Sequence, residues 1–177
     1  VVSITVNCVN DAPFWADDEL PDQSMDEDGS LTFRVEASDH DGPHPLSLTA
    51  SSDNENVTAT IIVTDDDEWA DDLNLTPAAN WHGTATITVT ASDGEYEAAK
   101  SFVLTVNDIN DNPTADAGQD QGPYTALFSD DYTVSVTLDG SGSYDVDGTI
   151  EAYSWSENDE EIANVSNPEF VLDVGVH

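Results

Sequence analysis

Apolar and polar residues alternate with a period of two along most of the chain, and this pattern decides which secondary structure it can form. In residues 84–91 every second residue is apolar and threonines fill the positions between. Successive side chains of a strand point to opposite faces, so the pattern predicts strands with one buried face. The same alternation recurs at Leu31, Phe33, Val35, Ala37, Phe102, Leu104, Val106, Val134, Val136, Leu138, Tyr153, Trp155, Phe170, Leu172 and Val174. Turns rich in glycine and aspartate separate these runs, and no amphipathic helix of ordinary length is visible. We therefore predict an all-β protein of tandem Greek-key β-sandwich modules.

A segment near the start of the chain recurs 100 residues later (107 − 7). Residues 2–13 read VSITVNCVNDAP and residues 102–113 read FVLTVNDINDNP. A strand that runs into an Asn/Asp-rich stretch and then proline is typical of a module boundary. We expect residues 1–10 to be the last strand of a preceding repeat, residues 11–112 to form one β-sandwich, and residues 113–177 to form a second, different one.

The charge of the chain excludes several classes of partner. It carries 38 acidic and 2 basic residues, a formal net charge of −36. Nucleic acid and anionic membrane surfaces are excluded as primary partners, because phosphate binding needs Lys and Arg. No stretch approaches the roughly 20 apolar residues of a membrane span. The only cysteine, Cys8, excludes an internal disulfide and a cysteine-rich zinc site. A folded chain with this self-repulsion needs bound cations or high salt, and halophilic adaptation is one explanation of the charge.

Three acidic clusters have the composition of calcium sites. They are the run Asp108–Asn112, the pair Asp39 and Asp41, and the pair Asp145 and Asp147. Calcium takes six to eight oxygens from carboxylates, amides and carbonyls, and closely spaced Asp and Asn on a turn supply several at once. A glycine follows each Asp-x-Asp pair and allows a tight turn around an ion. A solvated turn is the competing interpretation of these pairs, whereas the run at 108–112 falls at the predicted module boundary.

Two stretches resemble cadherin repeats. Residues 108–113, DINDNP, resemble the cadherin linker, and residues 75–94 resemble the cadherin-like tandem repeats of large bacterial surface proteins. The resemblance implies calcium between successive modules. The ligands that it implies after the 11–112 module are Asp108, the side-chain oxygen of Asn110, Asp111, the carbonyl of Asn112 and Glu27. The pair Asp145 and Asp147 would join them if the next module contributes. Those that it implies at the preceding junction are Asp39, Asp41, Asn10 and Asp11.

The chain also departs from the cadherin pattern. Asn7 and Cys8 replace acidic residues in the first linker, and the Asp-Arg-Glu segment is absent, with residues 77–83 in its place. We therefore expect fewer ions at each junction than animal cadherins bind.

From Pro113 the chain resembles a PKD (polycystic kidney disease type) domain. The resemblance rests on residues 113–118, 138–150 and 153–155. It implies an Ig-like sandwich with Trp155 as its core tryptophan, and a domain that lacks its closing strands at residue 177.

The sequence carries no catalytic signature. It lacks the His-Glu-x-x-His, Gly-x-Ser-x-Gly and P-loop motifs, and its four histidines share no ligand spacing. We expect no enzyme, but a calcium-stiffened segment of an extracellular adhesin, surface filament or stalk. Its expected partners are neighbouring modules of the same or identical chains, with a surface glycan or protein as a further possibility. The alternative is a carbohydrate-binding or accessory module of a secreted polysaccharide-degrading enzyme, which a coplanar, exposed tryptophan pair would favour.

Overall fold

The computed structural model describes residues 2–5, 7, 9–16, 20–41, 46–64, 70–122 and 133–173. The chain divides into two units, residues 1–109 and residues 110–177. The described residues contain strands and turns but no helix, which confirms the all-β prediction.

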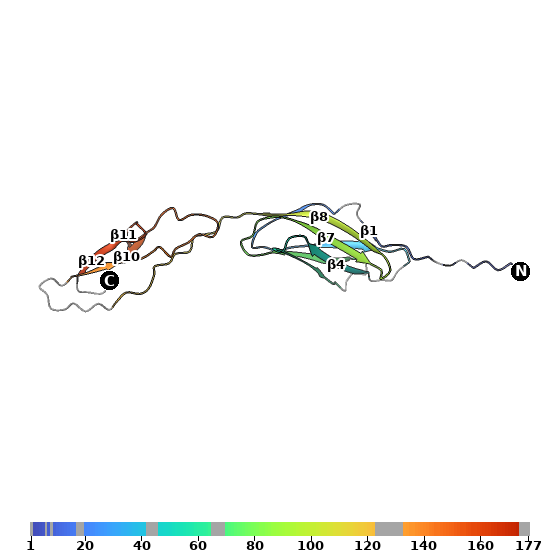
Figure 1. Cartoon of the computed structure of the whole chain (residues 1–177), viewed down its shortest axis with the longest axis horizontal. Coiled ribbons are helices and arrows are strands. Elements are labelled where there is room, and N and C mark those ends of the chain that lie inside the picture. The colour runs from blue at the N-terminus through green and yellow to red at the C-terminus, as the bar shows by residue number, and fades with distance from the viewer. Residues whose placement is uncertain are drawn as a thin grey trace. The chain divides into compact units, whose positions relative to one another are not determined.

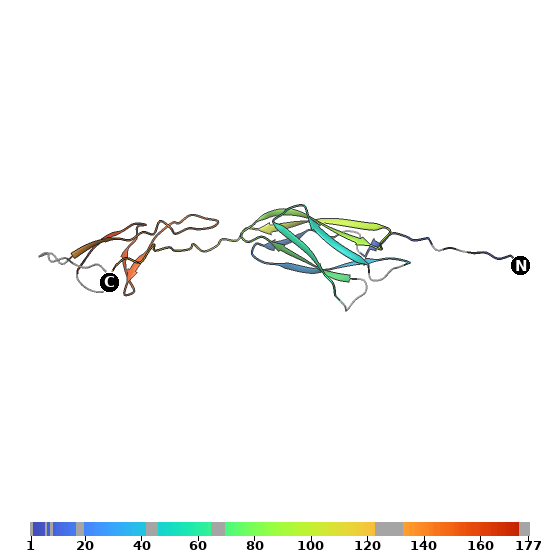
Figure 2. The ribbon, with the colours of Figure 1, turned by 60° about the horizontal axis from the view of Figure 1, so that its bottom comes forward.

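The first unit is a sandwich of two four-stranded sheets (Figures 1 and 2). One sheet has the order β1-β3-β6-β5 and contains β1 (Phe14–Trp15), β3 (Leu31–Ser38), β6 (Ala70–Pro77) and β5 (Val57–Ile62). The other has the order β2-β8-β7-β4 and contains β2 (Gln23–Asp26), β8 (Glu97–Asn107), β7 (Gly83–Ser92) and β4 (Ser47–Ser52). Successive strands often change sheet, as β3, β4 and β5 do, which is a Greek-key connection.

Among the described strands of this unit, one pair is parallel and the others are antiparallel. β2 runs parallel to β8, with Asp26 opposite Asn107. β7 and β8 form the longest ladder, from the pair Gly83–Val106 to the pair Ser92–Glu97. Residues that follow β2 and β8 therefore leave the sheet at the same end as the residues that precede β7.

The core lies between the two sheets and follows the alternation predicted from the sequence. On β7 the buried residues are Ala85, Ile87, Val89 and Ala91, and on β8 they are Phe102, Leu104 and Val106. Val35 on β3 and Leu73 and Leu75 on β6 face them from the other sheet. The rings of Phe33 and Phe102 meet edge to face across the core, with centroids 5.7 Å apart, an arrangement that aromatic quadrupoles favour.

The second unit contains two short pairs of strands. β9 (Thr133–Thr137) pairs with β12 (Glu169–Asp173), and β10 (Trp155–Glu157) pairs with β11 (Glu160–Ala163), all antiparallel. The β10–β11 turn has positive φ at both central residues, Asn158 (51°) and Asp159 (66°), as a type I′ hairpin turn requires.

Trp155 is half-buried in this second unit, and its Nε1 donates a hydrogen bond to the Val165 carbonyl (2.8 Å). A Cβ on Gly140 would lie 3.0 Å from the Ser166 carbonyl oxygen and 3.1 Å from the Trp155 ring. Glycine at position 140 therefore lets the chain pass close to the tryptophan. The predicted end of the last strand, at residue 174, lies outside the described residues.

The packing of the core predicts that the same Val→Ala substitution changes the free energy of unfolding much more at one position than at another. Val89 on β7 is fully buried, whereas Val103 on β8 is 40% exposed. We expect Val89→Ala to lower the free energy of unfolding of the first unit by about 2 kcal/mol, because it removes buried methyl groups and leaves a cavity. Val103→Ala is the matched control and should change it by less than about 0.5 kcal/mol. Native-state amide exchange of β7 and β8 measures both, and equal losses would contradict this packing.

A second prediction concerns acid stability. Asp53, in the turn between β4 and β5, accepts a hydrogen bond from the Thr86 N–H (2.7 Å). Hydrogen bonds from Thr86, the backbone one foremost, hold the pKa of Asp53 below its ordinary value. The charged form thus stabilises the fold above the unfolded pKa of about 3.9, and this contribution is lost as the pH falls through the lower folded pKa.

We therefore expect Asp53→Asn to be less stable than the parent near neutral pH, and the gap to shrink at about pH 3. Amide exchange of the β4–β5 turn at both pH values measures the gap. A gap that is the same at both would show that the charge of Asp53 contributes nothing.

Candidate metal centres

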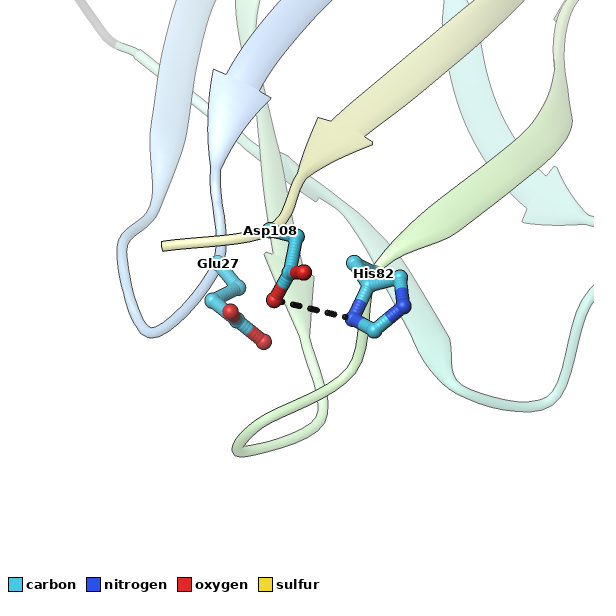
Figure 3. Close-up of side chains that lie close together, drawn as sticks. All are labelled: Glu27, His82 and Asp108. Atoms are coloured by element: carbon cyan, nitrogen blue, oxygen red, sulfur yellow. Dashed lines mark ion pairs between the residues drawn. The ribbon is translucent and has the colours of Figure 1, made fainter. Parts of the chain in front are cut away.

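Three ligand-type side chains converge at one end of the first unit (Figure 3). Glu27 follows β2, Asp108 follows β8 and His82 precedes β7, so the strand register places all three at the same edge of one sheet. One ligand atom from each lies within 4.8 Å of the other two. His82 Nδ1 and Asp108 Oδ1 are 3.4 Å apart.

Glu27 is buried although its ordinary state is charged. It is 7% exposed, whereas the side chains of His82 and Asp108 are 55% and 57% exposed. Its Oε1 accepts a hydrogen bond from the Ile109 N–H (2.8 Å), and its own N–H donates to the Asn107 carbonyl (3.0 Å). Glu27 is thus fixed against the chain that leaves β8.

The loop that carries His82 is held on both sides. Trp81 packs against the core, and a Cβ on Gly83 would lie 3.1 Å from the Trp81 ring. The Asn80 N–H donates to Asp28 Oδ1 (2.8 Å), which ties this loop to the turn that contains Glu27. Asp28 and Asn80 both have positive φ, 58° and 55°, a conformation that Asp and Asn tolerate better than most residues. The position of His82 is therefore determined by its neighbours.

A second acidic cluster lies at the other end of the first unit, where β3 ends and β8 begins. Asp39 is 5% exposed, its Oδ1 accepts the Asp41 N–H (3.0 Å), and its Oδ2 has no hydrogen-bond partner among the described residues. The Asp11 N–H donates to Asp41 Oδ2 (3.2 Å), and Asn10 Nδ2 donates to Asp93 Oδ2 (2.9 Å). Residues 10 and 11 thus connect the Asp39–Asp41 turn to the β7–β8 turn.

Asp93 organises the β7–β8 turn. Its Oδ1 accepts the N–H groups of Tyr96 (2.7 Å) and Glu95 (2.6 Å). These two hydrogen bonds, that of Tyr96 first, hold the pKa of Asp93 below its ordinary value. Asp93 is therefore a carboxylate that stays ionised beside Asn10.

In the second unit, hydrogen bonds connect Asp111 to the turn at residues 145–148. The Asp111 N–H donates to Asp147 Oδ2 (2.9 Å), and the N–H groups of Asp147 and Gly148 donate to Asp145 Oδ1 (3.3 and 2.9 Å). Asn110 Nδ2 donates to the Asp111 carbonyl (2.7 Å), and Asn112 is exposed. The run 108–112 is thus divided between the units after Ile109.

The structure adds two residues that the sequence analysis did not select, His82 and Asp93. The histidines share no ligand spacing in sequence, and His82 meets Glu27 only through the parallel pairing of β2 with β8, which no local pattern reveals. Among the other histidines, His40 stacks on Phe14 with centroids 4.7 Å apart, and His44 and His177 lie outside the described residues.

The tryptophans of the first unit do not form a sugar-stacking platform among its described residues. Trp15 and Trp81 are half-buried and pack against the core, and Trp15 Nε1 donates to the Ala98 carbonyl (3.2 Å). Trp69 lies outside the described residues. The alternative of a carbohydrate-binding module gains no support from Trp15 and Trp81.

The Greek-key sandwich of the first unit defines an immunoglobulin-like module. A family model described as "Bacterial Ig domain" matches residues 10–107, and the chain belongs to this family. This match does not test the resemblances to cadherin repeats and to a PKD domain, and both stay predictions.

Solved structures similar to the chain include Ig modules and a surface-layer protein. A chimeric titin Z1Z2 carrying a decorin peptide is 18% identical, with 56% of this chain and 98% of that one covered and a TM-score of 0.41. Domains 4 and 5 of the S-layer protein SbsC are 19% identical, with 59% and 49% covered and a TM-score of 0.38. Titin domain M7 is 14% identical, with 57% and 99% covered and a TM-score of 0.43. No curated protein matches the chain. The described residues form no helix suited to crossing a membrane.

The burial of Glu27 beside Asp108 gives a prediction for the metal-free protein. Glu27→Gln keeps an oxygen for the Ile109 N–H and removes one of two neighbouring negative charges. We expect it to stabilise the first unit by about 1 kcal/mol in chelator, since like charges at this separation repel. Glu27→Ala should destabilise it by about 1–3 kcal/mol, because the Ile109 N–H loses its acceptor.

Glu36→Gln is the control for a general loss of charge, because Glu36 is exposed on β3. Amide exchange in chelator measures all three variants. If Glu27→Gln destabilises the unit as much as Glu27→Ala, the repulsion between Glu27 and Asp108 is not significant.

Proposed function

We propose that this chain is a segment of an extracellular surface protein, an adhesin, filament or stalk, in which calcium stiffens successive β-sandwich modules. The family supplies a bacterial Ig-like building block, and the sandwich supplies carboxylates at both ends of the first unit. The role is structural, not catalytic. The expected partners are neighbouring modules of the same or identical chains, with a surface glycan or protein at the functional end, and nucleic acid is excluded by charge.

The observation that carries the proposal is the unpartnered Oδ2 of Asp39. A buried carboxylate oxygen without a partner is costly, because desolvation is not offset by a hydrogen bond. Asp41 and Asp11 are the next proposed ligands, because the Asp41 N–H donates to Asp39 Oδ1 and the Asp11 N–H donates to Asp41 Oδ2, so both residues adjoin the Asp39 turn. A calcium ion takes six to eight oxygens and would satisfy Asp39 Oδ2 while neutralising its neighbours. Asn10, whose Nδ2 donates to Asp93 Oδ2, is the remaining proposed ligand at this end.

The linker region carries the other proposed calcium ligands. They are Glu27 and Asp108 in the first unit, and Asn110, Asp111, Asn112, Asp145 and Asp147 in the second. In the second unit, hydrogen bonds from the Asp111, Asp147 and Gly148 N–H groups hold two of these carboxylates, those of Asp145 and Asp147.

The proposed mechanism is electrostatic. Without the ion, closely spaced carboxylates repel one another, and the segments that carry them move apart. With the ion, the same carboxylates are bridged in one geometry. An ion that binds only the folded state stabilises it by RT ln(1 + [L]/Kd), about 2.7 kcal/mol at a hundredfold excess over Kd.

Calcium, chelator, and chelator with molar salt should therefore give three different results. We expect calcium to raise the melting temperature and the rigidity seen in small-angle scattering. Molar sodium chloride in chelator should restore part of the melting temperature and little of the rigidity, because it screens repulsion over about 3 Å but cannot bridge carboxylates. If salt alone restores both quantities, the acidity is halophilic adaptation and the calcium proposal fails.

Single substitutions show which residues are responsible for the stabilisation by calcium. Asp39→Asn should remove the calcium-induced stabilisation of the Asp39 end, measured by amide exchange of residues 36–41, and leave the linker response intact. Asp111→Ala should do the reverse. Glu55→Gln is the matched control, because Glu55 is exposed in the β4–β5 turn. A calcium response of Asp39→Asn equal to that of the parent would exclude Asp39 as a ligand.

A further inference from the structure

We infer that His82, Glu27 and Asp108 form a binding site for a divalent transition metal ion of borderline softness, with zinc as its probe. This site shares Glu27 and Asp108 with the proposed calcium ligands of the linker, but it differs in kind because His82 adds an imidazole nitrogen. Figure 3 shows the His82 ring turned with Nδ1 toward Asp108, and the Glu27 carboxylate beside them.

The first argument is the distance between His82 and Asp108. Nδ1 and Oδ1 are 3.4 Å apart, which is beyond the usual 2.7–3.2 Å of an N–H···O hydrogen bond. Two ligands of a tetrahedral zinc ion, each bonded at about 2.05 Å, lie roughly 3.3 Å apart. The pair is therefore spaced as two ligands of one ion are spaced.

The second argument is the buried carboxylate. Glu27 is 7% exposed and its ligand atom lies within 4.8 Å of those of the other two residues. A carboxylate has two oxygens, so one can keep the Ile109 N–H while the other binds an ion. The chain's two basic residues are not placed to neutralise this pair. Lys100 is eight residues before Asp108 on β8, about 26 Å along a strand, and Arg34 lies opposite Asp72 in the other sheet.

The third argument is the ligand chemistry. Calcium and magnesium take oxygen ligands, so an imidazole nitrogen adds nothing to their binding. One His with two carboxylates suits zinc and its neighbours in the first transition series. Three protein ligands leave one tetrahedral position, which water fills. Trp81, Gly83 and the Asn80–Asp28 hydrogen bond already hold the His82 loop in place, so binding requires little reorganisation.

The test is a calorimetric titration of the whole chain with zinc in calcium-free buffer, because calcium would compete for Glu27 and Asp108. His82→Gln keeps a polar side chain at an exposed position. His40→Gln is the matched control, because His40 is exposed and stacks on Phe14 outside the cluster. We expect His82→Gln to weaken the zinc site roughly 100-fold or more, since losing an outer-shell partner alone weakens metal sites 10–100-fold. His40→Gln should bind zinc as the parent does.

The second readout is the ¹⁵N imidazole spectrum, in which zinc should shift Nδ1 of His82 and leave His40 unchanged. A parent chain without a stoichiometric zinc site, or a His82→Gln variant that binds zinc as tightly as the parent, would overturn the inference. Its failure is distinguishable from that of the proposed function, because His82→Gln should leave the calcium response of the Asp39 end intact.

Discussion

The antiparallel ladder between β7 and β8 is the interaction on which the first unit depends. It pairs residues 83–92 with residues 97–106 and supplies one wall of the core through Ile87, Val89 and Leu104. The same ladder determines where the acidic residues and His82 lie at the two ends of the module. Asp93 closes it at one end, and His82 and Asp108 flank it at the other. Hydrophobic burial in the middle of the ladder thus fixes the positions of ligand-type side chains at its ends.

Charge is the opposing constraint. With 38 acidic residues and 2 basic ones, the chain repels itself wherever carboxylates are brought together. Two of these carboxylates, on Glu27 and Asp39, are buried at opposite ends of the sandwich. The fold tolerates these two buried carboxylates because one oxygen of each accepts a backbone hydrogen bond. The Ile109 N–H donates to Glu27, and the Asp41 N–H donates to Asp39. The other oxygen of Asp39, Oδ2, has no hydrogen-bond partner among the described residues, and a bound cation would supply one.

The strands and the core could be predicted from the sequence, because alternation is a local signal. Ile87, Val89 and Leu104 are buried as their period of two requires. The turns rich in Asp and Gly were recognisable for the same reason. The burial of Asp39 could not be predicted, since nothing in the local sequence distinguishes Asp39 from the exposed Asp41.

The cluster at the other end depends on long-range pairing. Glu27 was connected with Asp108 only through a family resemblance, and the parallel pairing of β2 with β8 is the physical reason that they meet. His82 was missed because its partners are 55 and 26 residues away in sequence (82 − 27 and 108 − 82). Sequence spacing carries no signal for ligands that come from three different strand ends.

The central claim is that a hard cation completes the coordination of Asp39. A crystal structure of the chain grown in millimolar calcium tests it most directly. The account predicts an ion within about 2.3–2.6 Å of Asp39 Oδ2, surrounded by oxygen ligands only that include the Asp41 carboxylate. A well-ordered Asp39 with no ion beside Oδ2 in that structure would contradict it.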